Sequence, residues 1–516
     1  MSRTDSKTKK HGALDPLAQR YDVVIIGSGA GGGTLAHGLA RLGRKVLLIE
    51  QGTHLPQEAD NSSDAGVFGG KYMTRERMEV SGSRIRYPQY AFVGGQTKLY
   101  GAALYRLRQE DFGQLNFPDG LSPAWPIAYE DLEPYYCQAE ELYKVHGSDA
   151  EDPTEPPHSR PYPFGAVAHE GAVLPLLRKL QKQGYGASSI PKAIDLGDGG
   201  HCTFCSTCDA YACPTHGKMD TEVACILPAL ATGNLTLLTH AKCHRLLTNE
   251  SGDRITGMEL EYQDRRWTVD ADFYVSACGV FHSPALLLRS ANKSHPDGLA
   301  NSSGQVGRNL AGHNAAMFLL PGFRRLPDIH QKTFAVNNFY LGDTKYPFPM
   351  GILQAAGRMP IWQHTEKWLR PFAKIVTQRS LLCFLMSEVW PHPDNRVLLA
   401  KDGTIQIAFR PNNIKGFREL RSRFMKIFRR AGYLGALCSR HVGSGIPWHP
   451  VGTLRFGTDP GQSVLDTWCK THDVDNLYVV DSCFLPTAGA VNTSLTVMAQ
   501  ALRVADHLHN RLGPNA

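Results

Sequence analysis

Apolar and polar positions near the start of the chain follow a defined order. A short β-branched run from Val23 to Ile26 is typical of a buried parallel strand. Apolar residues then recur at helical spacing, at Leu35, Leu39 and Leu42, and Gly43 ends that pattern. A second apolar run follows from Lys45 to Ile49. The pattern therefore predicts a strand, a helix and a second strand between Tyr21 and Gln51.

The loop after the first predicted strand fits the pattern G-x-G-x-x-G. We expect Gly27 to allow the tight turn, Gly29 to let backbone approach a pyrophosphate beside Ala30, and Gly32 to let the helix pack on the strand. The pyrophosphate would then meet unpaired N–H groups at the positive end of the helix. Glu50, which closes the second strand, can accept hydrogen bonds from a ribose. Together these features predict a dinucleotide-binding unit.

A second glycine pair follows at Gly94 and Gly95, with Thr97 and Tyr100 close behind. Such a loop suits backbone that runs flush against a flat ligand, although a plain turn would look the same. Residues 151–165 are rich in proline and predict a linker or excursion, and short strands are expected between residues 234 and 278. Residues 320–445 carry no cofactor pattern, which suits a substrate-facing domain.

The last 70 residues are again dense in patterns. An apolar strand ends at Asp481, and a long helix follows with Asn492 or Thr493 as its N-cap. The apolar stripe expected on this helix consists of Leu495, Met498, Ala499, Leu502, Ala505 and Leu508. The positive helix end could stabilise an anionic ring, and Asp481 could hold a sugar or phosphate region. Taken alone, His449 and Asn492 also have structural interpretations. His449 could be part of a His-Pro turn, and the role of Asn492 could be limited to capping its helix.

Composition and charge narrow the class of protein. A chain of 516 residues exceeds what one hydrophobic core usually supports, so two connected domains are expected. The net charge of +7 is spread along the chain, which argues against nucleic acid as a partner. Residues 1–20 are polar and predict a disordered tail without a secretory signal, and no apolar run is long enough to cross a membrane, so a cytoplasmic protein is expected. The basic cluster at residues 421–430 predicts an amphipathic surface helix with a solvated face, not a site of peripheral membrane contact.

Four separate blocks, taken in order, resemble the glucose-methanol-choline (GMC) flavoprotein oxidoreductases over nearly the whole chain. The blocks are YDVVIIGSGAGGGTLAHGLARLGRKVLLIEQG, VGGQTKLYGAALYRL, FYVSACGVFHSPALLLRSA with VGRNLAGH, and HPVGTLRFG with VVDSCFLPTAGAVNTSLT. Within the family the chain looks nearest to bacterial sugar and polyol dehydrogenases or oxidases. The resemblance implies FAD as cofactor.

The resemblance also implies an architecture. The expected fold class is α/β, with a Rossmann-type FAD-binding domain assembled from residues 21–150, 200–320 and 446–516. An α+β substrate-binding domain with an antiparallel sheet would be inserted as residues 151–199 and 321–445.

Carried over residue by residue, the family's catalytic histidine falls on His449 and its partner on Asn492. A neutral imidazole can take the alcohol proton while hydride leaves for flavin N5. The position at which some relatives attach FAD covalently through histidine is Leu99, so non-covalent FAD is expected. The family's methionine in H-x-x-G-T-x-R-M-G is Phe456, which blurs any inference about the substrate.

A cysteine cluster, Cys202, Cys205, Cys208 and Cys213, leaves three interpretations open. The spacing is one residue longer than a ferredoxin iron–sulfur pattern, and some similar sugar dehydrogenases carry a cluster in this region. Zinc would want two pairs separated by a longer loop. We favour a cysteine-rich packed loop near the flavin, with or without a disulfide and with no metal, over both.

The sequence as a whole favours FAD-dependent oxidation of a CH–OH group in a sugar, glycoside or polyol. Two alternatives stay open: a non-redox flavoprotein lyase of the same fold, and the flavoprotein subunit of a membrane-linked electron-transfer complex. Oxygen, a quinone or a protein could each be the electron acceptor, and the sequence does not distinguish them.

Overall fold

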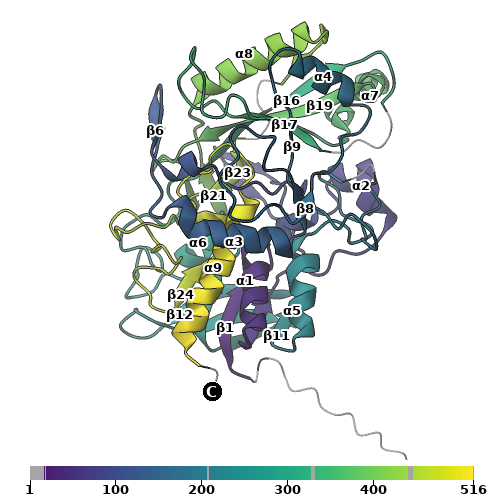
Figure 1. Ribbon diagram of the computed structural model, residues 1–516. Helices are drawn as coiled ribbons and strands as arrows, with labels where there is room; N and C mark the ends of the chain where they lie inside the picture. The colour runs from purple at the N-terminus through teal and green to yellow at the C-terminus, as the bar shows by residue number, and fades with distance from the viewer. Residues whose placement is uncertain (1–16, 18, 206–207, 327–331, 440–444, 515–516) are drawn as a thin grey trace, which may run out of the picture.

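The computed structural model describes residues 17, 19–205, 208–326, 332–439 and 445–514. Most of the expected N-terminal tail, residues 1–20, therefore lies outside the described residues. Two sheets dominate the molecule (Figure 1). A parallel sheet with helices α1, α5 and α9 occupies one half, and an antiparallel sheet with helices α4, α7 and α8 occupies the other.

The parallel sheet is built from strands that lie far apart in the sequence. Its order is β11-β2-β1-β15-β24, and all its pairs are parallel; the strands are β1 (Tyr21–Ile26), β2 (Val46–Ile49), β11 (Leu235–Leu238), β15 (Ala271–Ser276) and β24 (Leu477–Val479). Val23 pairs with Val46 on one side and with Phe273 on the other, so β1 is central and fully surrounded. The loops that follow β1, β2, β15 and β24 consequently open at one edge of the sheet, where open α/β sheets bind ligands.

Helices from the two ends of the chain cover this sheet together. Helix α1 (Ala30–Arg41) packs directly on α9 (Ser494–Leu512), and α3 (Tyr129–Leu142) packs on the outer side of α9. The helical stripe predicted for the C-terminal segment is confirmed, because all of its members are buried: Leu495, Met498, Ala499, Leu502, Ala505 and Leu508. Helices α5 (Leu227–Ala231) and α6 (His282–Arg289) are short elements beside the parallel sheet.

The antiparallel sheet is centred on two long strands. Its order is β22-β16-β19-β18-β17-β9, with β23 also paired to β16; the strands are β9 (Ser188–Ser189), β16 (Ala311–Pro321), β17 (Phe334–Val336), β18 (Ile352–Ala355), β19 (Ser380–Val389), β22 (Leu437–Cys438) and β23 (Trp448–Val451). Every residue of β19 is buried. Helix α8 (Ile414–Arg430) packs against β19 and β16, and Phe384 and Met386 of β19 line the large cavity described below. Helices α4 (Leu174–Gln181) and α7 (Arg370–Thr377) lie in the same half (Figure 1).

The amphipathic helix predicted at residues 421–430 is confirmed as the last part of α8. Its apolar side chains Phe424, Ile427 and Phe428 are buried against the antiparallel sheet, while Arg429 and Arg430 are exposed. The apolar face of this helix is therefore used inside the protein.

The short strands predicted between residues 234 and 278 are also present. After β11, strands β12 (Ala241–Thr248), β13 (Ile255–Tyr262) and β14 (Arg265–Val269) form an antiparallel sheet, and the chain returns to the parallel sheet as β15. A smaller sheet has the order β20-β21-β3-β4, with β3 (Met78–Val80), β4 (Ser83–Ile85), β20 (Arg396–Leu399) and β21 (Ile405–Ala408). In the part of the chain that the structure describes, no helix combines the length and apolar character needed to cross a membrane.

Candidate functional site

A cavity of about 1280 Å³ opens between the edge of the parallel sheet and the antiparallel sheet. It is lined by segments from both ends of the chain, and it includes most of the residues singled out in the sequence: Gly27, Gly29, Ala30, Glu50, Gly95, Thr97, Leu99, Tyr100, His449, Asp481, Asn492 and Thr493. Gly32 and Gly94 lie behind this lining. The structure thus brings the predicted dinucleotide loop and the predicted catalytic pair into one space.

The glycine loop leaves room for a ligand on one side and none on the other. A Cβ atom added to Gly29 would meet no atom within 4 Å, although Gly29 lines the cavity. A Cβ atom added to Gly32 would lie 2.0 Å from the carbonyl oxygen of Gly27. The space beside Gly29, at the start of α1, is therefore suited to a pyrophosphate that accepts hydrogen bonds from the helix N-terminus.

Glu50 connects three segments at this end of the cavity. The Ser28 hydroxyl donates to Glu50 Oε2 at 2.6 Å, and the backbone N–H of Gly52 donates to Oε1 at 2.9 Å. The N–H of Gly94 in turn donates to Ser28 Oγ at 3.2 Å. Burial raises the pKa of the Glu50 carboxyl, and these donors oppose the rise. Oε2 also accepts from the backbone N–H of Ser28 at 3.4 Å, whereas Oε1 has a second lone pair with which it can accept a ribose hydroxyl.

At the other end of the cavity, pairing of β23 with β16 places two imidazoles side by side. Trp448 is in register with His313, so the next residue, His449, meets His313 with Nδ1 to Nδ1 at 3.1 Å. His449 has a φ of 44°, a left-handed conformation that residues with a Cβ rarely adopt. Backbone of this kind concentrates at functional sites, where the surrounding structure supports the strain.

The hydrogen-bond chain through these rings assigns their tautomers. His313 Nε2 lies 3.1 Å from the carbonyl oxygen of Gly489, which only accepts, so Nε2 carries the proton and Nδ1 is an acceptor. His449 must then donate from Nδ1, and the lone pair on its Nε2 is an acceptor. Asn492 Nδ2 lies 3.3 Å from that Nε2 and donates to it. The lone pair of His449 Nε2 therefore points toward Asn492, which also lines the cavity.

Burial keeps both imidazoles neutral. It lowers the pKa of His313 to about 4, against its hydrogen bonds to backbone carbonyls. Burial also lowers the pKa of His449 well below its ordinary value, and the neighbouring His313 and the positive charge of Lys332 lower it further. At neutral pH, His449 is consequently a hydrogen-bond and proton acceptor at Nε2.

Gln354 on β18 fixes the orientation of Asn492. Its side-chain Nε2 donates to Asn492 Oδ1 at 2.8 Å, which turns Asn492 Nδ2 toward His449. The predicted helix cap is placed correctly at Thr493, but the Thr493 side chain makes no capping bond. The Asn492 side chain therefore forms its hydrogen bonds with the site residues Gln354 and His449.

Asp481 lines the cavity, and its carboxylate already accepts hydrogen bonds from groups of the protein. Its Oδ2 accepts from the N–H of Gly279 at 2.9 Å and from the Ser283 hydroxyl at 2.5 Å, and its Oδ1 accepts from the N–H of Cys483. Asp481 therefore holds the loop after β15 against the loop after β24.

Several site residues escaped the sequence analysis. His313 stood in a quoted block, VGRNLAGH, but carried no assigned role, and its signal is its position at the start of a long strand. Gln354 and Lys332 lie in segments with no recognisable pattern, and Asp209 lies inside the cysteine cluster, where it carried no assigned role. The fold brings Lys332 and Asp209 to the cavity and Gln354 to Asn492.

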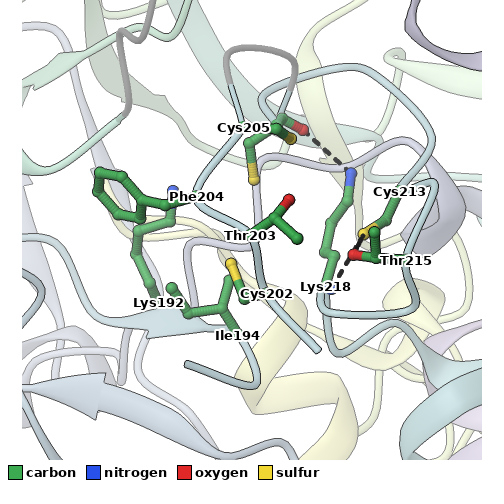
Figure 2. A pocket seen from close by; sticks show the side chains of 10 residues that line it. Lys192, Ile194, Cys202, Thr203, Phe204, Cys205, Cys213, Thr215 and Lys218 are labelled. Atoms are coloured by element: carbon green, nitrogen blue, oxygen red, sulfur yellow. Dashed lines mark hydrogen bonds between the residues drawn. The ribbon is translucent and has the colours of Figure 1, made fainter. Parts of the chain in front are cut away.

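The four clustered cysteines line a second, small cavity (Figure 2). Lys192 and Lys218 are buried beside them, and Lys218 Nζ donates to the backbone carbonyls of Tyr100 and Cys208 at 2.9 and 3.0 Å. Cys202, Cys208 and Cys213 are free thiols, and burial raises the pKa of Cys202. Within the described ranges, no three His, Cys, Asp or Glu side chains are arranged to hold a metal ion. Lys218 thus ties together the loop that contains the cysteines.

Comparisons with known proteins identify the family. Two family profiles described as GMC oxidoreductase match residues 21–315 and 392–501. The chain is 30% identical to 6'''-hydroxyparomomycin C oxidase of Streptomyces lividus, over 95% of this chain and 92% of the relative. It is 31% identical to paromamine 6'-oxidase of Streptomyces fradiae, over 94% and 90%, and 26% identical to the fructose dehydrogenase large subunit of Gluconobacter japonicus, over 95% and 98%.

Solved structures share the fold. Pyridoxine 4-oxidase from Mesorbium loti superimposes with a TM-score of 0.65 at 19% identity, over 95% of this chain and 99% of that chain. A formate oxidase variant from Aspergillus oryzae superimposes with a TM-score of 0.64 at 16% identity, over 96% and 98%. The expected α/β fold class is confirmed by these neighbours, and the family implies FAD. The chain belongs to the GMC oxidoreductase family and is an oxidoreductase that acts on CH–OH groups.

Proposed function

We propose that this protein oxidises a CH–OH group of a sugar, glycoside or polyol to a carbonyl, with His449 as the base. The observation that carries this proposal is the lone pair on His449 Nε2, directed by its bond to His313 toward the cavity that the dinucleotide loop also lines. A substrate hydroxyl placed between His449 and Asn492 would donate its proton to Nε2 and accept from Asn492 Nδ2. When bound, FAD supplies the acceptor for the hydride that leaves the same carbon.

FAD would be held by the segments that line the cavity. The space beside Gly29 would take the pyrophosphate, Glu50 the adenosine ribose, and Gly95, Thr97 and Tyr100 the flat ring system. Ala30, Asp481 and Thr493 would complete the contacts, with Gly27, Gly32 and Gly94 shaping the loops. Leu99, which lines the cavity where some relatives use histidine, has no nucleophilic atom, so the attachment would be non-covalent.

The substrate class follows from the relatives and not from a pattern in the cavity. Their names describe oxidation of paromamine, of a hydroxyparomomycin and of fructose. The first two substrates are aminoglycosides and the third is a sugar, so all three carry hydroxyl groups.

The proposed domains follow the two large sheets, except that β23 pairs with the antiparallel sheet from within the C-terminal segment. Residues 21–150, 200–310 and 446–516 would form the FAD-binding domain, and residues 151–199 and 311–445 the substrate-binding domain. The expected boundary near residue 320 moves to residue 310 in this proposal, because β16 begins at Ala311 and belongs to the antiparallel sheet.

The test is a panel of alcohols, sugars and polyols added without oxygen, with flavin absorbance as the readout. We expect at least one polyhydroxylated compound to bleach the flavin. The variant His449→Ala should keep its FAD and lose about 10²–10⁴-fold in the rate of bleaching. The matched control His244→Ala, on β12 and paired with Glu261, should bleach at the parent's rate. A parent that no alcohol bleaches, or a His449→Ala variant as fast as the parent, would refute the proposal.

A further inference from the structure

One wall of the large cavity carries a buried pair of opposite charges. Lys332 and Asp209 are only 6% and 7% exposed, both line the cavity, and Lys332 Nζ lies 4.0 Å from Asp209 Oδ2. Buried charges are costly unless they are paired and hydrogen-bonded. A separation of 4.0 Å is longer than a hydrogen bond, so the ammonium group and the carboxylate each face the cavity with bonding capacity left.

Contacts on the same wall connect Lys332 to the proposed base. Its ammonium lies over the ring of Phe384, 5.7 Å from the centroid, and Phe384 packs on Trp448 with ring centroids 4.8 Å apart. Trp448 directly precedes His449, and the Lys332 charge is among the causes that lower the pKa of His449. Lys332 therefore lies close to the place where a substrate hydroxyl would meet His449.

Asp209 is held rigidly by backbone. The N–H of Gly357 donates to its Oδ2 at 3.1 Å, and a Cβ atom added to Gly101 would lie 2.3 Å from its Oδ1. The carboxylate is thus fixed by Gly357 on one side and by close contact with Gly101 on the other. Fixed polar groups of this kind determine the orientation of small ligands.

The other charged side chains that line the cavity lie toward its opposite end, near Glu50 and Asp481. Lys242 and Arg289 lie with Cys243 beside Glu50, where the N–H of Ala241 donates to the Glu50 carbonyl. The Asp481 carboxylate is taken up by Gly279 and Ser283. Lys192, whose charge also acts on Lys332, lines the cysteine cavity and not this one. Among the described lining residues, the charges near His449 consequently balance as one cation and one anion.

We propose that Lys332 and Asp209 are specificity-determining residues that select an electrically neutral substrate with neighbouring hydroxyl groups. Lys332 Nζ donates to one hydroxyl and an Asp209 oxygen accepts from the next, while a third hydroxyl meets His449. A carboxylate in place of the hydroxyl at Asp209, or an ammonium group in place of the hydroxyl at Lys332, would meet a like charge. The opposite placement would pair the analogue with one member of the buried ion pair and leave the other member without its counter-ion, so both charged analogues are disfavoured. This inference rests on the proposed function and narrows its substrate class.

The experiment compares three compounds with one carbon skeleton: a hexitol, the corresponding hexonate and the corresponding amino hexitol. The parent should have its highest kcat/KM on the hexitol. Lys332→Met should lower kcat/KM for the hexitol about 10- to 100-fold, mainly through KM, because a hydrogen bond to a charged group is lost. It should also move the preference toward the amino hexitol, since Asp209 then lacks its cation. Asp209→Asn, which can still accept from Gly357, should move the preference toward the hexonate.

Controls separate a binding role from a structural one. Lys332→Arg keeps the charge and should restore most of the preference for the hexitol. FAD content and thermal melting of each variant show whether it folds. Equal losses on all three compounds, or a parent that prefers a charged analogue, would overturn the inference. A parent whose flavin no compound bleaches would instead refute the proposed function, so the two failures are distinguishable.

Discussion

At the scale of single residues, the site depends on which nitrogen of His449 carries the proton. His313 sets that tautomer by accepting from His449 Nδ1 at 3.1 Å while donating to Gly489. We expect His313→Leu to leave the Nδ1 proton of His449 without an acceptor, and an unsatisfied buried donor costs about 1–3 kcal/mol of folding free energy. The same variant should lower kcat about 10- to 100-fold. His313→Gln can accept and donate at similar positions and should recover most of kcat. Single-turnover flavin reduction measures both, and equal losses in the two variants would contradict this role.

The pH dependence of kcat/KM follows from the same residues. His449 must be neutral to act as a base, and burial, His313 and Lys332 all lower its pKa below 6.5. Activity should therefore persist as pH falls through 6.5 and be lost only when the pH passes the lowered pKa of His449. Lys332→Met removes one of the lowering charges, so the acid limb of the profile should move to higher pH. A parent whose acid limb lies above pH 6.5 would contradict the assignment.

Sequence reasoning reached some of these residues and not others for a physical reason. His449 and Asn492 lie in recognisable blocks, and their pairing was implied by the family resemblance. His313 acts because β16 pairs with β23, Gln354 because β18 brings it to Asn492, and Lys332 because the segment before β17 lines the same cavity. Contacts between strands more than a hundred residues apart leave no local periodicity to detect.

At the scale of elements, the start of α1 has an open side at Gly29, which lines the cavity, and a packed side at Gly32, which contacts the preceding loop. Gly29→Ala places a methyl group where no protein atom lies within 4 Å, so the fold should tolerate it. If FAD fills that space, the added methyl group should overpack it at a cost of about 1–3 kcal/mol and weaken FAD binding about 10- to 100-fold. The matched change Gly32→Ala meets the Gly27 carbonyl at 2.0 Å and should lower stability even without FAD. Flavin titration and melting of the FAD-free proteins test both, and equal FAD affinity in Gly29→Ala and the parent would place the pyrophosphate elsewhere.

Helix α8 shows what an amphipathic pattern can predict. The spacing of Phe424, Ile427 and Phe428 indicated a surface helix, and the structure buries these three side chains. Phe428 is fully buried and packs on Phe318 with ring centroids 5.1 Å apart. The pattern alone could not say which sheet the helix covers.

Truncating this contact tests its contribution to stability. Phe428→Ala should lower the free energy of unfolding by about 3–5 kcal/mol, because it leaves a cavity against β16. Arg429→Ala, on the exposed side of the same helix, should change it by less than about 0.5 kcal/mol. Denaturant unfolding gives both values. Similar losses in the two variants would mean that the burial of this face contributes little.

At the scale of the whole molecule, the two ends of the chain share one structure. Strand β24 completes the sheet that β1 begins, and α9 packs on α1. The resemblance allowed this discontinuous arrangement to be predicted, while the local patterns indicated only separate strands and helices. The seven-stranded sheet was predicted only as an antiparallel sheet, because short buried strands such as β17 and β18 differ little from other apolar runs.

Because the cavity is lined by residues from both chain ends, bound FAD should stabilise the molecule as a unit. A ligand that binds only the folded state at 100 times its Kd raises the free energy of unfolding by about 2.7 kcal/mol. Removal of FAD should therefore lower the melting temperature, and added FAD should restore it in a concentration-dependent way. Riboflavin, which lacks the pyrophosphate and adenosine, leaves the space beside Gly29 and Glu50 unfilled and should restore much less. Melting curves that FAD does not move, or that riboflavin moves equally, would show that the dinucleotide end of this cavity does not hold the cofactor.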